Sequence, residues 1–312
     1  LILTENNEVF DKLYIEIICT CVFIGGLSFL VLIAKDFRKI DIENKFEQIE
    51  KYISECDSYI SMLYKMHLNN DLITKLAEKN IPIFVKTPEI ENGCCYCFVE
   101  ESGERTFISH HGAEYLFSKE WMKNINLDDF DSVYICGLEI EERTGIEIVS
   151  WLEENMGANL QIYFAPGPRL TKIDSVLISR IFALNPVIHL NELESQDFAR
   201  EKDVIKAAKH IFAQTKNTVI ITLGEKGCAY FDGENFDIIP VMSCGDKNYV
   251  VDTIGAGDSH IGAFIAAQKR NFSIEKSCKI ANTVSKAVVS VSGASLNDSN
   301  LCFSVFEDTS QN

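Results

Sequence analysis

A short glycine-rich segment toward the C-terminal end of the chain holds the residues best suited to chemistry. Residues 252–262 read DTIGAGDSHIG, and the apolar-periodic segment 261–267 continues from them. The β-prone residues 249–251 come first, so the order predicts a strand, a glycine turn and the start of a helix. The first turn of a helix exposes backbone N–H groups and the positive end of the helix dipole. The segment therefore predicts an anion site.

Asp258 stands inside this predicted anion site. A carboxylate would repel a phosphate that is merely bound, whereas it suits a base that takes a proton from an attacking hydroxyl. Gly255 and Gly257 lack the Cβ atoms that would hold a phosphate away from the backbone. Two familiar motifs are excluded, because His260 occupies the third glycine position of G-x-G-x-x-G and no segment matches G-x-x-x-x-G-K-[ST]. The segment predicts phosphoryl transfer; the structural alternative is a glycine turn capped by an acidic residue.

Residues 252–258 resemble the D-T-x-G-A-G-D signature of the ribokinase-like, or pfkB, carbohydrate and nucleoside kinases, and every defined position is present. In that family the last aspartate is the catalytic base, and the Gly-Ala-Gly amides stabilise the transferring phosphoryl group. The resemblance assigns the base, which meets the substrate hydroxyl, to Asp258, and the stabilising amides to Gly255, Ala256 and Gly257.

Further segments match the family in its order along the chain: FAPGPR at 164–169, HLNELE at 189–194, TVIITLGEKG at 218–227 and ANTVSKAVVSVSGA at 281–294. The resemblance implies ATP and Mg²⁺ as cofactors and admits a monovalent cation as a further one. It assigns nucleotide binding to Asn191, Glu194, Thr222, Gly224, Gly227, Thr253 and Asn282, and proximity to the metal to Glu194 and Asp252.

Each of these residues, taken alone, also has a structural interpretation. Asn191 suits a helix N-cap, Gly224 and Gly227 suit ordinary turns, and Arg169 suits an ion pair. We expect His260 on a helix surface rather than at the reaction centre. The order of the motifs favours one site, because ligands of a doubly wound sheet bind beyond the carboxyl ends of its strands.

The N-terminal part of the chain, where the family binds its substrate, shows little resemblance, since the match is good only from about residue 93 to 294. Gly25 and Gly26 stand where the family places substrate-binding glycines, but the asparagine that follows in the family is missing. GER at 103–105 and HGA at 111–113 also resemble the family. We expect an uncharged sugar or nucleoside-like acceptor, because no basic cluster is available for a substrate phosphate. The alternative is a catalytically weak homologue that binds a nucleotide or metabolite for regulation, tethered to a membrane.

Strands alternate with helices, which predicts a doubly wound, mainly parallel sheet with helices on both faces. The resemblance adds a small β lid, which we expect around 83–110, and a homodimer formed through it. We expect one domain over 1–312 with a frayed tail at 307–312. The predicted strands are 15–24, 132–136, 160–164, 187–190 and 218–223, with hairpins at 93–109 and through 232–233. The predicted helices are 27–37, 40–56, 141–154, one from Asp174, 192–198, 203–214, 255–270 and 273–290.

The net charge and the hydropathy of the chain bear on whether it binds nucleic acid or membranes. A formal net charge of −17 argues against nucleic acid and anionic membrane surfaces, which need basic footprints. Residues 17–34 carry no charge and are long enough for a transmembrane helix. The favoured interpretation is a buried strand, the Gly25-Gly26 turn and a buried helix. No basic region precedes this segment, so we expect no secretory signal.

Cysteine usage indicates a reduced, cytoplasmic protein. The eleven cysteines are odd in number, and their one C-x-x-C, Cys94 to Cys97, has no second pair at zinc-site spacing. We therefore expect neither a zinc site nor a redox pair, but thiols that pack as small hydrophobic groups.

Overall fold

The computed structural model describes residues 15–18, 28–34, 94–99, 105–112, 115–123, 125–157, 159–241 and 250–291. The chain divides into two compact units, a first unit of residues 1–114 and a second unit of residues 115–312. Gly25, Gly26, the predicted helix over 40–56 and the tail at 307–312 lie outside the described residues.

The first unit contains a four-stranded sheet in the order β1-β2-β3-β4. Its strands are β1 (Ile15–Ile18), β2 (Ser28–Ala34), β3 (Cys94–Val99) and β4 (Arg105–His110). β3 and β4 pair antiparallel, which confirms the predicted hairpin. The predicted helix over 27–37 is wrong, because β2 pairs with β1 on one side and β3 on the other. The continuous apolar run at 29–33 fits a buried strand as well as a buried helix, and the two neighbouring strands decide the choice.

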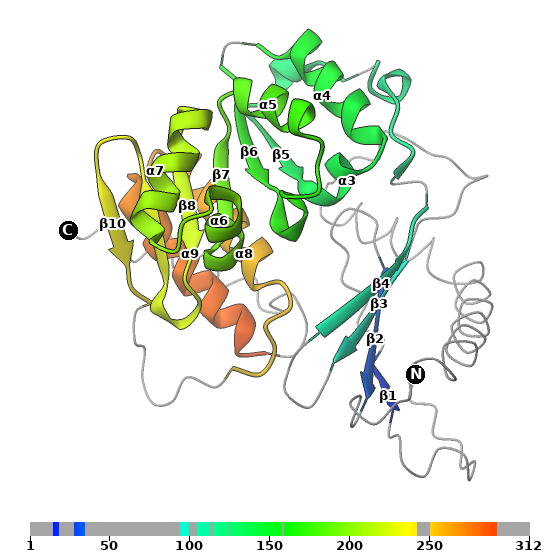
Figure 1. The fold of residues 1–312 in the computed structure, drawn as a ribbon, viewed down its shortest axis with the longest axis vertical. Coiled ribbons are helices and arrows are strands. Elements are labelled where there is room, and N and C mark those ends of the chain that lie inside the picture. The colour runs from blue at the N-terminus through cyan, green and yellow to red at the C-terminus, as the bar shows by residue number, and fades with distance from the viewer. Residues whose placement is uncertain are drawn as a thin grey trace. The chain divides into compact units, whose positions relative to one another are not determined.

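The second unit is built on a six-stranded sheet in the order β10-β9-β8-β7-β6-β5 (Figure 1). β5 to β8 run parallel, while β9 and β10 form an antiparallel edge. The strands are β5 (Ser132–Cys136), β6 (Gln161–Ala165), β7 (Val187–Asn191), β8 (Val219–Thr222), β9 (Cys228–Phe231) and β10 (Phe236–Ile239). The predicted α/β class with a mainly parallel sheet is confirmed.

Helices cover both faces of this sheet, as predicted (Figure 1). They are α3 (Gly137–Glu141), α4 (Thr144–Asn155), α5 (Ser175–Ala183), α6 (Glu192–Ala199), α7 (Val204–Thr215), α8 (Ala256–Gln268) and α9 (Ile274–Val289). The prediction of one helix over 141–154 needs correction, because the chain breaks between α3 and α4. The Thr144 hydroxyl donates to the Glu139 carbonyl over 3.0 Å, and a Cβ on Gly145 would lie 2.3 Å from the Ile140 carbonyl oxygen.

The alternation of side chains along the strands creates two cores. Phe164 and Ile221 pack with residues of α4, α5 and α7 on one face. Their neighbours Tyr163 and Ile220 pack with α8 and α9 on the other. Successive side chains of a strand point to opposite faces, so a sheet buried on both sides needs continuous apolar runs.

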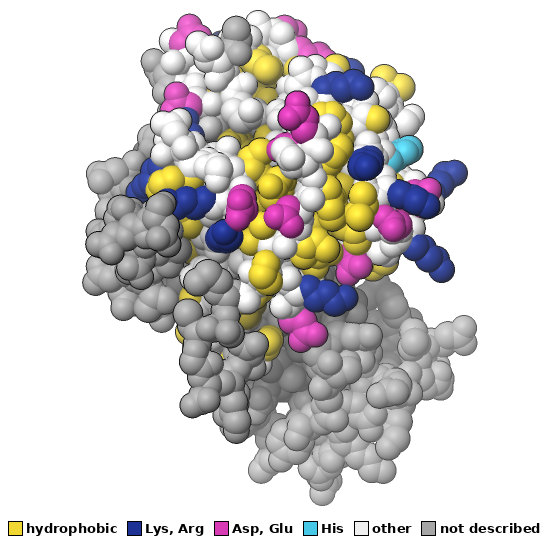
Figure 2. Space-filling model, turned by 90° about the vertical axis from the view of Figure 1, so that its left-hand side faces the viewer, with side chains coloured by type: hydrophobic (Ala, Val, Ile, Leu, Met, Phe, Trp, Pro, Cys, Tyr) yellow, Lys and Arg dark blue, Asp and Glu magenta, His cyan; other side chains and the backbone are white. Residues whose placement is uncertain are grey.

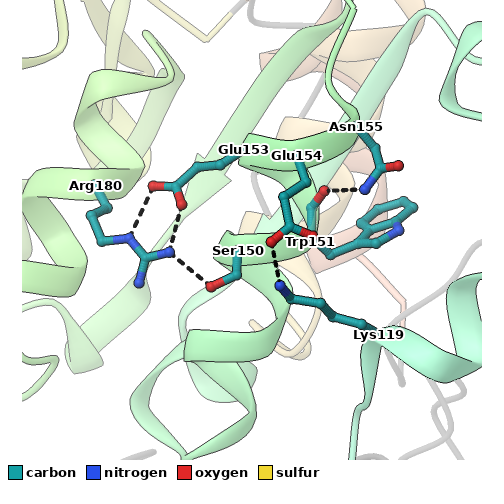
Figure 3. Close-up of polar contacts among 7 residues, drawn as sticks. All are labelled: Lys119, Ser150, Trp151, Glu153, Glu154, Asn155 and Arg180. Atoms are coloured by element: carbon teal, nitrogen blue, oxygen red, sulfur yellow. Dashed lines mark hydrogen bonds and ion pairs between the residues drawn. The ribbon is translucent and has the colours of Figure 1, made fainter.

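Helices α4 and α5 are also joined by polar contacts near their exposed surfaces (Figure 3). Arg180 donates from Nε to Glu153 Oε1 over 2.9 Å and from Nη2 to Glu153 Oε2 over 2.5 Å. The same Nη2 donates to Ser150 Oγ over 2.8 Å. This pairing lowers the pKa of Glu153 and raises that of Arg180. A two-point contact fixes the angle between side chains better than a single ion pair does.

One face of the molecule shows hydrophobic side chains between scattered acidic and basic ones (Figure 2). Among the large hydrophobic residues exposed in the second unit are Ile205 of α7 and Ile238 of the edge strand β10. Asp237 stands exposed beside Ile238. A charged side chain on an edge strand disfavours pairing with another sheet.

The segment before α8 differs from its prediction. Val250 and Val251 belong to no strand and are 64% and 58% exposed. The backbone N–H of Val251 donates to the Val289 carbonyl at the end of α9 over 2.8 Å. β-Branched residues favour a strand only where a neighbour is available to pair with them.

No helix among the described residues is both long and apolar enough to cross a membrane.

Candidate active site

A pocket opens at the carboxyl ends of β7 and β8, where the sequence places two of its motifs. Asn191 and Thr222 are direct partners in the parallel register of these strands. The pocket has a volume of about 540 Å³ and is lined by Asn191, Glu192, Leu193, Gln196, Thr222, Leu223 and Gly224. The structure therefore brings Asn191, Thr222 and Gly224 together from two segments about 30 residues apart in the chain.

Asn191 and Glu194 form a capping box at the start of α6. Asn191 Oδ1 accepts from the Glu194 backbone N–H over 2.8 Å, and Glu194 Oε2 accepts from the Asn191 N–H over 2.9 Å. Burial raises the pKa of Glu194, and the hydrogen bond from Asn191 partly offsets that rise. The N-cap interpretation of Asn191 thus holds, and the cap also turns this residue toward the pocket rim.

The turn after β8 contains both glycines of the second motif. The Gly227 N–H donates to the Gly224 carbonyl over 3.1 Å, and the Leu223 N–H donates to the Gly227 carbonyl over 2.7 Å. Both glycines have positive φ, +61° at Gly224 and +98° at Gly227. A Cβ on Gly224 would meet nothing within 4 Å, whereas one on Gly227 would lie 2.0 Å from the Ile239 carbonyl oxygen. Gly224 thus faces open space at the pocket, and Gly227 serves close packing.

The predicted anion site forms the first turn of α8. Gly255, the N-cap residue, has a φ of +78°, which favours glycine. Asp252 accepts from the Ile254 N–H over 2.9 Å, and the Thr253 carbonyl accepts from the Ala256 N–H over 3.3 Å. A Cβ on Gly257 would meet nothing within 4 Å. The backbone at the helix start is therefore open to an approaching anion.

Asp258 lies in this first turn, with its side chain accessible to solvent. Partial desolvation by the surrounding protein nonetheless raises the pKa of Asp258 above its usual range. A raised pKa suits a base, because the carboxylate then holds an abstracted proton more firmly.

Asp258 acts electrostatically on two residues that the sequence does not single out, Tyr134 and Cys136. Burial raises the pKa of Tyr134, and Cys136, Asp258 and Glu139 raise it further. Burial and then Glu139 raise the pKa of Cys136 to about 12, with a smaller contribution from Asp258. Tyr134 and Cys136 belong to β5, and Glu139 follows in α3. The rule that ligands bind beyond strand ends, applied to the predicted strand 132–136, could have found them.

The FAPGPR segment supports this corner of the sheet. A Cβ on Gly137 would lie 1.9 Å from the Pro166 carbonyl oxygen, so the glycine allows the two strand ends to approach. Arg169 pairs with Glu141 over 2.8 Å. Its interpretation as an ion-pair partner is confirmed.

One predicted position needs correction. His260 is buried rather than on the helix surface, because α8 turns this side toward β7 and α9. Asn282 is also buried; its Nδ2 donates to the Ile239 carbonyl over 2.8 Å, and its Oδ1 lies 3.2 Å from His260 Nε2. The contact of Asn282 with the nucleotide stays a prediction.

The predicted metal residues are two carboxylates, Glu194 and Asp252. Among the residues that the structure describes, no group of three or more His, Cys, Asp or Glu side chains could hold a metal ion. Magnesium commonly binds through substrate phosphates, waters and one or two carboxylates. Glu194 and Asp252 each offer a carboxylate, which is a donor type that magnesium uses.

The fold defines a ribokinase-like protein. The ribokinase of Thermotoga maritima has a TM-score of 0.62 at 24% identity, over 76% of this chain and 77% of that one. The ribokinase of Giardia lamblia has a TM-score of 0.66 at 18% identity, over 77% and 78%.

Sequence comparison narrows the class to a family. The model of the pfkB family carbohydrate kinases matches residues 55–300. The uncharacterised sugar kinase YegV of Escherichia coli is 30% identical over 69% of this chain and 66% of its own length. The mouse ribokinase is 25% identical over 72% of this chain and 70% of its own length. The chain belongs to the pfkB family of carbohydrate kinases.

Proposed function

We propose that this protein transfers the γ-phosphoryl group of ATP, with the help of Mg²⁺, to a hydroxyl group of a sugar or sugar-like small molecule. The observation that carries the proposal is the placement of Asp258, an accessible carboxyl with a raised pKa in a glycine-lined first helical turn. A site for anion binding alone gains nothing from a carboxylate, whereas phosphoryl transfer to a hydroxyl needs a base beside the phosphate.

The residues of this chain take three roles in the proposal. Asp258 accepts the proton of the acceptor hydroxyl. The backbone N–H groups from Gly255 to Asp258 stabilise charge on the transferred group, with the help of the α8 dipole. The pocket at Asn191, Thr222 and Gly224 receives the nucleotide phosphates.

Magnesium, when bound with ATP, supplies positive charge that offsets the charge of the phosphates. Glu194, which forms the capping box of α6 with the pocket residue Asn191, and Asp252, before α8, are the residues that would hold it. A local metal and helix N-termini also explain how a chain with a net charge of −17 accepts a polyanion.

The surroundings of Asp258 favour an uncharged acceptor. Asp258 and Glu139 both act electrostatically on Tyr134, so two carboxylates lie at this corner of the sheet. A phosphorylated sugar placed beside them would be repelled. The acceptor panel should include nucleosides, because a nucleoside kinase of Methanocaldococcus jannaschii is among the relatives, beside ribokinases.

The decisive experiment compares Asp258→Asn with wild type for ADP release against neutral sugars and nucleosides. Loss of a general base lowers turnover by about 10²–10⁴-fold, while ATP binding measured by calorimetry stays close to wild type. Asp197→Asn, a matched change on the exposed side of α6, should keep full turnover. Wild-type turnover in Asp258→Asn would refute the assigned base. Absence of turnover with every acceptor would favour the binding-only alternative.

A further inference from the structure

A chain of buried hydrogen bonds runs beneath the first turns of α8. His189 of β7, His260 of α8 and Asn282 of α9 are 6%, 2% and 4% exposed. His189 Nε2 lies 3.0 Å from His260 Nδ1, and His260 Nε2 lies 3.2 Å from Asn282 Oδ1. Asn282 Nδ2 donates to the Ile239 carbonyl at the end of β10 over 2.8 Å. Two strands and two helices are thus connected by one line of polar contacts.

The carbonyl at the end of this line fixes the direction of two of the bonds. A carbonyl only accepts, so the Asn282 nitrogen must face Ile239 and its oxygen must face His260. That oxygen also only accepts, so His260 carries a proton on Nε2. The bond between the two imidazoles needs one N–H, which either His189 Nε2 or His260 Nδ1 can supply.

Burial, and then the His260 ring, lower the pKa of His189 well below its ordinary value, so His189 stays neutral.

Two thiols also lie beside the pair: Cys228 of β9, which hydrogen bonds with His260, and Cys278 of α9, which hydrogen bonds with Cys228. Glu275 acts on Cys278 from within α9. The hydrogen bonds with Cys278 and then with His260 lower the pKa of Cys228 to about 6, although its burial opposes this.

Each of the two imidazoles lies close in sequence to a residue of the candidate active site. His189 precedes the pocket residue Asn191 by two positions, and His260 follows Asp258 by two. Their contact therefore joins the strand end at the pocket to the helix turn that carries the base. A directional hydrogen bond specifies one arrangement, whereas apolar packing tolerates small shifts between a helix and a sheet.

We propose, on the basis of the function proposed above, that His189 and His260 form a positioning pair for phosphoryl transfer. The pair fixes the first turns of α8 relative to the end of β7, and so sets the distance between Asp258 and the phosphates. Neither ring touches the substrate in this proposal; each acts through the element that carries it.

The test uses His260→Phe in the full 312-residue chain, with His210→Phe as the matched change at an exposed position of α7. A displacement of about 1 Å at a reaction centre lowers turnover by up to about 100-fold, so we expect kcat to fall by about tenfold or more. The KM for ATP should change by less than about threefold, because the nucleotide pocket lies outside the pair. His210→Phe should behave as wild type. Wild-type kcat in a folded His260→Phe would overturn the proposal.

A spectroscopic measurement and a second pair of variants cover the case in which His260→Phe does not fold. The ¹⁵N shifts of wild-type imidazoles at neutral pH should show a proton on His260 Nε2, which the bond to Asn282 Oδ1 requires; a His260 Nε2 without a proton would overturn the proposal. His189→Gln keeps an N–H donor near the Nε2 position and should retain kcat, whereas His189→Leu should lose it. Equal kcat in these two variants would also count against the pair.

Failure of the proposed kinase activity would be recognised separately. If wild type phosphorylates no acceptor, the function proposed above fails, but amide hydrogen exchange in α8 remains measurable. Faster exchange at residues 260–264 in His260→Phe or His189→Leu than in wild type would still support the positioning pair. Unchanged exchange would overturn it.

Discussion

The turn between β8 and β9 offers a sharp test of the structure, because its two glycines have different reasons to be glycine. Gly227→Ala would place a Cβ 2.0 Å from the Ile239 carbonyl oxygen and 3.0 Å from Asn282 Nδ2. Its backbone, with φ +98° and ψ −130°, is also in a region that side chains disfavour. Backbone strain of this kind costs about 1–3 kcal/mol. Overpacking adds about 1–3 kcal/mol, so the loss in free energy of unfolding should total about 2–6 kcal/mol.

Gly224→Ala is the matched control in the same turn. Its φ is +61°, and its added Cβ would meet nothing within 4 Å, so only the left-handed backbone opposes it, at about 1–2 kcal/mol. Gly224 also lines the pocket proposed for the nucleotide phosphates. We therefore expect Gly224→Ala to weaken ATP binding more than it weakens the fold, and Gly227→Ala to do the reverse.

Thermal unfolding and calorimetric ATP titration of both variants would measure these two effects. Each kcal/mol shifts Tm by about 2–4 °C in a domain of this size, so Gly227→Ala should melt several degrees below Gly224→Ala. If Gly227→Ala melts at or above Gly224→Ala, the backbone at 227 does not approach Ile239 as described, and the reasoning fails.

Three further predictions concern pH, capping and surface charge. Because desolvation raises the pKa of Asp258, kcat/KM should fall on acidification at a pH above the ordinary aspartate value of about 3.9; a pH–rate profile whose acid limb lies at or below that value would contradict this. Asn191→Ala should lower the free energy of unfolding by about 1 kcal/mol in urea titrations, with Asn191→Asp near wild type, and equal losses would exclude the cap. Arg180→Ala should cost about 0.2–1 kcal/mol at low salt and less in 1 M NaCl, because the Glu153 pair is near the surface; a loss that salt leaves unchanged would point to packing instead.

Local pattern was enough to predict most of the second unit. The strand at 132–136 and the helices that begin after Asp174, Asp203 and Ser273 follow from apolar periodicity and N-cap residues. The convergence of Asn191 and Thr222 at one pocket was predictable as well, because parallel strands bring their carboxyl ends to one edge.

The sequence pattern did not predict secondary structure correctly where the neighbours of a segment decide whether it forms a strand. The apolar run of β2 suits a buried helix or a buried strand by hydropathy alone, and the presence of β1 and β3 settles the choice. Val250 and Val251 are β-prone, but Val251 bonds to the end of α9 and both residues stay outside the sheets.

The sequence by itself determined the family, the glycine-lined helix start and the carboxylate of Asp258 within it, because these depend on the types and spacing of adjacent residues. Only the tertiary structure separated Gly224 from Gly227, brought Tyr134 and Cys136 into the field of Asp258, and buried His260 against His189. Those relations join residues far apart in the chain. Their side chains meet only when two-sided burial of the sheet has fixed which face each helix turns inward.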